Sequence, residues 1–113
     1  MMESSKLRRG SVWWVNLDPT LGSEIKKVRP CVLVGASPIN QARRTVLVVP
    51  LSSSGSPPQP PITVKVSCMG KNVLAVCDQL RAVDKTRLSD RIEMMDRESL
   101  DAVSKALQQV LSL

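Results

Sequence analysis

Short apolar runs separated by turn residues dominate most of the chain and predict a series of β-strands. The strands are expected over residues 11–17, 31–34, 45–51, 62–67, 73–80 and 91–95. In the fourth run, Ile62, Val64 and Val66 alternate with polar residues, which is typical of a strand with one buried face. The fifth run is more continuously apolar, and we expect it to lie nearer the centre of the sheet.

After the last predicted strand, the apolar period changes to that of a helix. Asp96 is expected to cap this helix, and Glu98 lies in its first turn, where negative charge suits the helix dipole. The apolar residues that follow recur on one helical face, at Leu100, Val103, Leu107, Val110 and Leu111. The chain is therefore expected to close with one amphipathic helix, and a single helical turn is expected earlier, over residues 39–43.

Two polar segments separate the predicted strands. Residues 20–28 are charged and contain a glycine, and they are expected to form a loop. Residues 52–61 (SSSGSPPQPP) are interpreted as a Pro-stiffened surface loop, and Pro50 places the end of the preceding strand at an edge or a bulge. Together these elements predict an α+β fold, with residues 1–113 as one domain built on a compact, strongly bent sheet with a C-terminal helix.

Composition limits the chemistry that the chain can perform, because its 113 residues include no His, Phe or Tyr. A His general base, a zinc site of Cys and His ligands and an aromatic RNA-stacking platform of the RRM kind are therefore excluded. Lys and Arg number 16 against 10 Asp and Glu, and residues 1–49 hold eight of the basic but only three of the acidic residues. This asymmetry indicates an anionic partner, with nucleic acid the first candidate, although a solvated surface explains the charge equally well.

The three cysteines, Cys31, Cys68 and Cys77, lie in or beside apolar runs and show no CxxC spacing. We interpret them as small buried hydrophobic residues in a reducing compartment rather than as disulfide partners or reactive thiols. No apolar stretch approaches the roughly 20 residues that a membrane span needs, and no signal-peptide pattern follows the basic start. A cytoplasmic protein without membrane association is therefore expected.

Charged residues gather at the entrance of the second predicted strand and suit phosphodiester chemistry. RNA carries its own nucleophile, the 2′-OH, so an enzyme has to supply a base, a proton donor and groups that stabilise phosphorane charge. Glu24 is a candidate base, Arg29 can donate two parallel hydrogen bonds to phosphate oxygens, and Ser52 can add a hydroxyl donor. Such a scheme needs neither a metal ion nor a cofactor.

A second polar cluster lies where the fifth predicted strand ends, at Asp78 and Gln79, with Arg81 and Asp84 close behind. An Asp at the end of a central strand costs free energy unless it is paired or hydrogen-bonded. An Arg–Asp pair that holds loops against the sheet is the structural interpretation of this cluster, and participation in the reaction is the alternative.

Three motifs occur in the order RGSVWWVNLDPTLGSE…VRPCVLV, TVLVVPLS and VCDQLRAVDKTRLSD, and together they resemble the MazF/PemK (Kid) family of toxin endoribonucleases. The resemblance runs from Arg9 through the closing helix. It implies an SH3-like β-barrel with a C-terminal helix, a homodimer, and ribosome-independent, sequence-specific cleavage of single-stranded mRNA that arrests growth. It also implies a type II toxin–antitoxin system, in which an acidic, initially disordered antitoxin segment covers the RNA groove.

The resemblance also implies roles for individual residues. Glu24 and Arg29 match the GSE…RP motif, whose Arg is a principal catalytic residue, and Ser52 stands where many relatives have a catalytic Thr, with Ser53 as a helper. Asp78 matches the acidic residue of PemK-like members, so the choice of base between Glu24 and Asp78 stays open. The other residues that we expect to bind RNA are Lys26, Lys27, Arg43 and Arg81. For Lys26, Lys27 and Arg43, a solvated surface charge with no RNA contact is an equal alternative.

The chain departs from some PemK-like members at Ser23 and Val76, where those members carry His and Arg. A mechanism that depends on these two side chains is therefore closed to this protein, and the MazF-like arrangement of Arg29 and Ser52 is favoured. The alternative function is that of a CcdB-like toxin, which has the same fold and inhibits DNA gyrase by binding without cutting RNA. The presence of Glu24, Arg29, Ser52 and Asp78 argues against this alternative.

Trp13 and Trp14 are consecutive in a predicted strand, so their side chains are expected on opposite faces of the sheet. One is expected in the core, and the other at the dimer interface or beside the RNA. For either residue, packing is a better explanation than base stacking.

Overall fold

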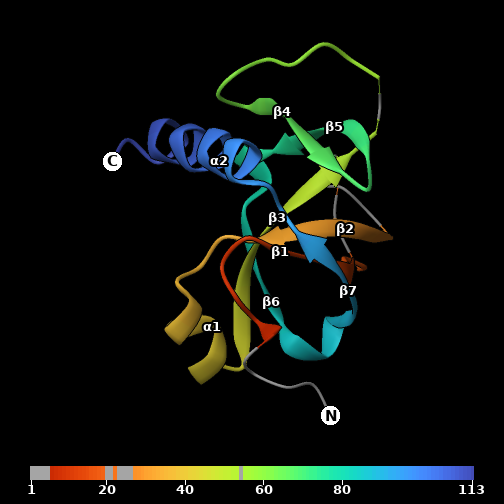
Figure 1. Cartoon of the computed structure of the whole chain (residues 1–113). Coiled ribbons are helices and arrows are strands. Elements are labelled where there is room, and N and C mark those ends of the chain that lie inside the picture. Colours follow the sequence, from red (N-terminus) through yellow and green to blue (C-terminus); the bar gives the residue numbers. More distant parts are fainter. Residues whose placement is uncertain (1–5, 20–21, 23–26, 54) are drawn as a thin grey trace.

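In the computed structural model, seven strands and two α-helices account for most of the residues that the structure describes, which are 6–19, 22, 27–53 and 55–113 (Figure 1). The elements follow one another as β1 (Ser11–Asn16), β2 (Val28–Leu33), α1 (Ser37–Ala42), β3 (Thr45–Ser52), β4 (Thr63–Cys68), β5 (Lys71–Val76), β6 (Arg81–Asp84), β7 (Leu88–Met94) and α2 (Arg97–Val110). Short 3₁₀ turns at Cys77–Gln79 and Lys85–Arg87 flank β6.

The strands form one antiparallel sheet in the order β4-β5-β3-β2-β1-β7, and β6 pairs with β3 outside this path. The sheet is open and strongly bent, and α2 packs against β4 at the end opposite to α1 (Figure 1). The expected bent antiparallel sheet with a C-terminal helix is therefore confirmed.

Strand β3 produces the bend by changing its partner. Its first half pairs with β6 (Thr45↔Asp84 to Val48↔Arg81), and its last two residues pair with β5 (Leu51↔Ala75, Ser52↔Leu74). Pro50, which has no N–H to donate, lies in the interval between the two partners. The proline thus occupies a position where one strand serves both halves of the sheet.

The central strands are buried on both faces, which explains why they are continuous apolar runs in the sequence. One face contributes residues such as Val12, Val32 and Val49 to a core beneath α2. The other face contributes Trp13 and Leu33 to a second core that also contains Leu7 and Leu88. A small chain thereby builds two hydrophobic clusters around one sheet.

The C-terminal helix forms as its pattern predicts. The Asp96 carboxylate caps it by accepting a hydrogen bond from the Ser99 N–H at 2.8 Å. Val103 and Leu107 are buried in the core beneath the helix, and Leu100 and Val110 pack against it. Leu111 was expected on the same face, but the helix ends at Val110 and Leu111 is 48% exposed.

Several strand boundaries differ from the sequence-based expectation. The strand predicted over residues 73–80 ends at Val76, because Cys77 turns into the core and the Leu80 N–H then donates to the Cys77 carbonyl. The chain next forms β6, which the sequence analysis missed. Strand β2 begins at Val28 rather than at Cys31, because Val28 to Pro30 pair with β1, and β7 begins at Leu88 rather than at Arg91.

All three cysteines are buried and free, as expected. Burial raises the pKa of Cys31 to about 12 despite the nearby Arg81, and raises the pKa of Cys77 to about 11. Both thiols therefore stay protonated near neutral pH. Residues 55–60 are exposed, in agreement with the expected surface loop, and none of the described helices is long and apolar enough to cross a membrane.

Candidate active site

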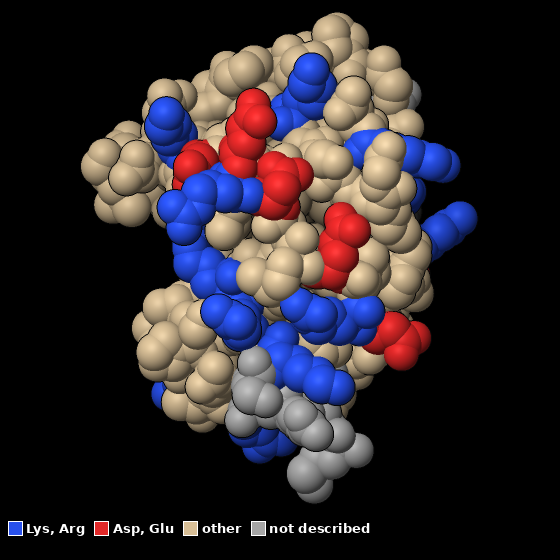
Figure 2. Space-filling view, viewed as in Figure 1, with Lys and Arg blue, Asp and Glu red and all other residues tan. Residues whose placement is uncertain are grey.

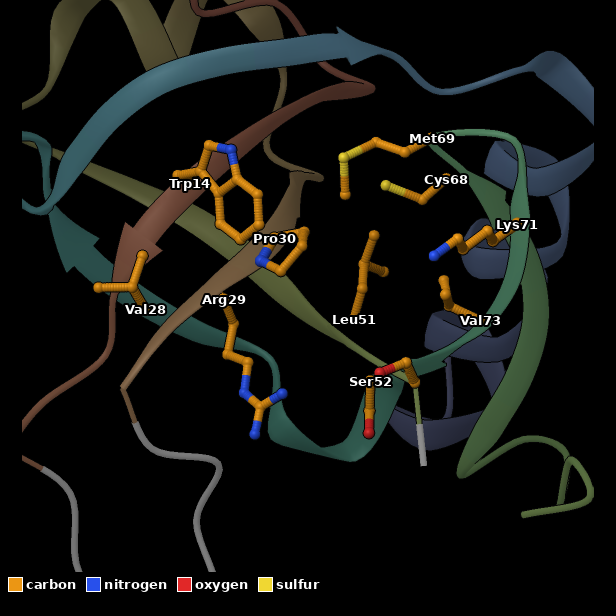
Figure 3. A pocket seen from close by; sticks show the side chains of 11 residues that line it. Trp14, Val28, Arg29, Pro30, Leu51, Ser52, Cys68, Met69, Lys71 and Val73 are labelled. Carbon is orange, nitrogen blue, oxygen red and sulfur yellow. The ribbon is translucent and has the colours of Figure 1, made fainter. Parts of the chain in front are cut away.

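A pocket of about 240 Å³ opens where the start of β2 and the end of β3 face the β4–β5 hairpin (Figure 3). Its walls are mostly apolar, and its polar side chains are those of Arg29, Ser52, Ser53 and Lys71. The remaining lining residues are Trp14, Val28, Pro30, Leu51, Cys68, Met69 and Val73. The pocket thus collects three of the residues predicted from the sequence, Arg29, Ser52 and Ser53.

The register of β2 against β3 explains why Arg29 and Ser52 meet although they are far apart in the sequence. The hydrogen-bonded pairing of the two strands ends at Cys31↔Pro50. Two residues further along each strand, at the end beside the pocket, are Arg29 and Ser52. Figure 3 shows both side chains extending toward the same side of the pocket. A hydroxyl and a guanidinium can therefore act on one bound group.

Arg29 lies at the edge of an apolar wall. The next residue, Pro30, restricts Arg29 to extended backbone and pairs with Trp14 across β1 and β2. Trp14 is half-buried, and Figure 3 shows its indole beside the Pro30 ring. Val28, on the other side of Arg29, is 52% exposed. The guanidinium therefore emerges from a strand end that pairing and packing hold in place.

Two arginines anchor the segment that leads toward this strand end. The Arg87 guanidinium donates to the Asn16 carbonyl at 3.1 Å and also to the Asp18 carbonyl. Arg81 donates to the Leu17 carbonyl at 3.5 Å. The Asp18 carboxylate in turn accepts from the Lys27 N–H at 2.9 Å. These contacts fix both ends of the connection between β1 and β2.

The wall of the pocket that faces Arg29 is the tight β4–β5 hairpin. Cys68 pairs with Lys71, and the two residues between them, Met69 and Gly70, both have positive φ (51° and 73°). This is a two-residue turn whose twist matches that of the flanking strands. Lys71 was not among the residues predicted for the site, because Met-Gly is not one of the residue pairs that mark a two-residue hairpin.

The other predicted residues lie outside the pocket or at its edge. Lys27 is exposed and directly precedes the lining residue Val28. Arg81 is half-buried and donates to the Leu17 carbonyl just after β1, and Asp78 is exposed on the 3₁₀ turn. Neither lines the pocket. Arg43 is exposed just before β3, at the opposite end of that strand from Ser52.

Glu24 and Lys26 lie outside the described residues. Asp84, considered as a partner in an Arg–Asp pair, caps a 3₁₀ turn by accepting from the Thr86 N–H at 2.9 Å. That hydrogen bond and one from the Thr86 hydroxyl lower the pKa of Asp84. Within the described part of the chain, no three His, Cys, Asp or Glu side chains are placed to hold a metal ion.

Positive charge is not confined to the pocket. Figure 2 shows Lys and Arg side chains across the lower half of one face and along its upper rim, whereas Asp and Glu gather mainly in its upper middle. Charge alone therefore does not identify the site. The pocket lined by Arg29, Ser52 and Lys71 is a better indication of it.

Comparison with known proteins identifies the family of the chain. Residues 8–111 match the family described as PemK-like, MazF-like toxin of type II toxin-antitoxin system. The chain belongs to this family. Two relatives are the Bacillus subtilis endoribonuclease EndoA, 30% identical over 95% of this chain and 96% of that protein, and the Escherichia coli endoribonuclease PemK, 32% identical over 96% and 84%.

Solved structures of the PemK/MazF family share the fold. MazF from Deinococcus radiodurans superposes with a TM-score of 0.80 at 20% identity, covering 94% of this chain and 96% of that one. A mycobacterial endoribonuclease in complex with its cognate antitoxin superposes with a TM-score of 0.77 at 19% identity, covering 94% and 95%. The protein is thus a PemK/MazF toxin of a toxin–antitoxin system, and its curated relatives are endoribonucleases.

Proposed function

We propose that the protein is a metal-independent, sequence-specific endoribonuclease that cleaves single-stranded mRNA at the Arg29–Ser52 pocket. The observation that carries the proposal is the convergence of Arg29 and Ser52 on one pocket of a PemK/MazF fold. Its relatives EndoA and PemK are named endoribonucleases, which supports RNA as the substrate.

The pocket can stabilise the charge that develops during attack by the 2′-OH. The attacking hydroxyl loses a proton, its oxygen bonds to phosphorus, and the bond from phosphorus to the 5′-oxygen breaks as that oxygen gains a proton. The Arg29 guanidinium donates to the non-bridging oxygens, where negative charge increases, and the Ser52 hydroxyl adds a further donor. The products are a 2′,3′-cyclic phosphate and a 5′-OH, and no step requires a metal ion.

Because the chain contains no His, proton transfer is shared among carboxylates, Arg29 and hydroxyl groups. Glu24 and Asp78 are the two candidates for the base. Asp78 is exposed on the 3₁₀ turn outside the pocket lining, so its participation requires that bound RNA extends beyond the pocket. Glu24 belongs to the GSE…RP motif that also contains Arg29, which favours it as the base.

The apolar wall supports recognition of bases. Trp14 and Pro30 offer flat, half-buried surfaces beside Arg29, against which an unstacked base can lie. A base can reach this wall only when the strand is unpaired. The proposed preference for single-stranded RNA follows from this geometry.

The proposed partners follow from the same site. An antitoxin with an acidic, disordered segment suits a protein of net charge +6. The mycobacterial endoribonuclease of similar fold was solved in complex with its cognate antitoxin. We also propose a homodimer that acts in the cytoplasm and arrests growth by cleaving mRNA. Such an assembly would extend the RNA groove beyond one chain.

The proposal is tested by incubating the purified protein with long single-stranded RNA in excess EDTA. We expect cleavage at a limited set of sequences, because Arg29 and hydroxyl donors supply the stabilisation that a metal ion would otherwise give. RNA that stays intact in EDTA but is cleaved after Mg²⁺ is added would contradict metal independence. Inhibition of DNA gyrase without any RNA cleavage would favour the CcdB-like alternative.

Replacement of Ser52 tests the hydroxyl donor. We expect Ser52→Ala to lower kcat/KM about 10- to 100-fold, the effect of removing a hydrogen bond to a charged group, whereas Ser52→Thr keeps most of the activity. Initial rates on one cleaved RNA, with unfolding curves for each variant, measure this. Equal losses in both variants would mean that residue 52 acts through packing rather than through its hydroxyl.

A further inference from the structure

We infer that Lys71 is a phosphate-binding residue of the RNA site and holds a phosphate next to the one that Arg29 contacts. The inference rests on the proposed function, because it assumes that RNA occupies the pocket. It adds a second cation on the wall opposite Arg29, so that the RNA backbone would cross the pocket between these two walls.

The position of Lys71 is fixed by its hairpin. The two-residue turn pairs Lys71 directly with Cys68, so Lys71 begins β5 at a defined register. The turn is also tied to β7, because the Glu93 carboxylate accepts a hydrogen bond from the Met69 N–H at 3.0 Å. Lys71 therefore belongs to a constrained strand end rather than to a free loop.

The side chain is directed into the pocket. Figure 3 shows the Lys71 ammonium pointing toward the space between Leu51 and Ser52, with Val73 and Cys68 on either side. Among the residues that the structure describes, none forms a hydrogen bond or an ion pair with the Lys71 ammonium. The Glu93 carboxylate accepts from the Met69 N–H at this turn, and within the described part of the chain it forms no ion pair with Lys71. The cation is thus available to an anionic ligand.

The ligand that fits this arrangement is a phosphodiester backbone. Arg29 lies on β2 and Lys71 on β5, on opposite walls, and the Ser52 hydroxyl lies on β3, the strand that separates them in the sheet order. Successive phosphates of one RNA strand can therefore reach Arg29 and Lys71 in turn. Lys is suited to this role because it binds phosphate as a compact point charge.

The test uses binding rather than cleavage, so that it stays separate from the proposed reaction. The probe is a single-stranded oligonucleotide with 2′-deoxyribose at the cleaved position, or a mixed-sequence DNA 12-mer if no cleaved site is found. Affinity is measured by fluorescence anisotropy over a range of salt concentrations for wild type, Lys71→Met, Lys71→Arg and Lys65→Met. Lys65 is the matched control, because it is an exposed lysine of the same hairpin that does not line the pocket.

We expect Lys71→Met to weaken binding about 10-fold at low salt and to reduce the slope of log K against log salt by about 0.7, the value for one single-strand phosphate contact. Lys71→Arg should bind like wild type, and Lys65→Met should leave the slope unchanged. A second series of probes carries one neutral methylphosphonate each, in place of a single phosphate. Lys71→Met and the wild type should bind equally well at only one position of this substitution.

An unchanged slope in Lys71→Met, or equal changes in Lys71→Met and Lys65→Met, would overturn the inference. So would an effect of Lys71→Met that persists at every methylphosphonate position. Cleavage of all-RNA substrate by the wild type is followed in parallel. If the wild type cleaves RNA but Lys71→Met binds the probe as the wild type does, only the role of Lys71 is refuted. If Lys71→Met reduces the salt dependence of binding but the wild type does not cleave RNA, only the proposed reaction is refuted.

Discussion

Replacing Arg29 with Ala is expected to lower kcat/KM for RNA cleavage by about 10²- to 10³-fold, the usual cost of removing a principal donor to transition-state charge. Arg29 is the pocket's only guanidinium among the described residues. It lies two residues beyond the last β2–β3 pair and lines the same pocket as Ser52. Lys71 supplies charge on the opposite wall but not the paired hydrogen bonds of a guanidinium. The loss should therefore appear in kcat as well as in KM.

Arg29→Lys separates charge from hydrogen-bond geometry. It keeps the positive charge but not the planar pair of donors, so we expect an intermediate loss of activity. Arg29 is half-buried at a strand end, and both variants should remain folded by circular dichroism and thermal unfolding. Wild-type rates in a folded Arg29→Ala protein would remove the Arg29–Ser52 pocket from the mechanism.

The second large effect is a loss of stability on replacing Trp13, which is buried in the core, whereas its neighbour Trp14 lines the pocket. Trp13 is 3% exposed in the core with Leu33 and Leu88, and its indole N–H donates to the Ser11 hydroxyl at 3.0 Å. Trp13→Ala should therefore lower the free energy of unfolding by about 3–5 kcal/mol, the usual cost of truncating a buried Trp. Because the total for a small domain is about 5–15 kcal/mol, much of the protein's stability would be lost.

Trp14→Ala provides the matched contrast. Trp14 lines the pocket beside Pro30 and is half-buried, so we expect a smaller loss of stability. If a base packs against this indole, RNA binding should weaken by about 1–3 kcal/mol, the range for one base stacked on an aromatic ring. Urea unfolding and RNA titration of both variants measure the two effects. The same loss of stability in both would contradict the division of roles.

Much of the fold was predictable because the local patterns agree with the tertiary structure. The helical face of α2 and its Asp96 cap were identified from spacing alone, and the described structure contains both. The end of β5 was not identified, because the apolar run extends to Cys77 and no Gly or Pro interrupts the chain before Leu80. The backbone turns there because β3 offers a new edge to β6, and this is a tertiary effect.

The candidate site was predictable where a motif placed a residue at a strand end. Arg29 and Ser52 meet because the β2–β3 register brings them together, and the sequence pattern alone does not contain that register. Lys71 was missed, since its role depends on the direction of a side chain leaving a two-residue turn. Arg43 shows the opposite case, because its charge suits RNA but the fold places it at the far end of β3 from Ser52.

Metal-independent attack by the RNA's own hydroxyl at this pocket is tested most directly with one oligonucleotide in two forms. An RNA that the protein cleaves is compared in EDTA with the same RNA carrying 2′-deoxyribose only at the nucleotide 5′ to the cleaved bond. We predict that the first is cut to 2′,3′-cyclic phosphate and 5′-OH ends, and that the second binds but stays intact. Cleavage of the deoxy-substituted RNA, or products with a 5′-phosphate, would show that water rather than the 2′-OH attacks.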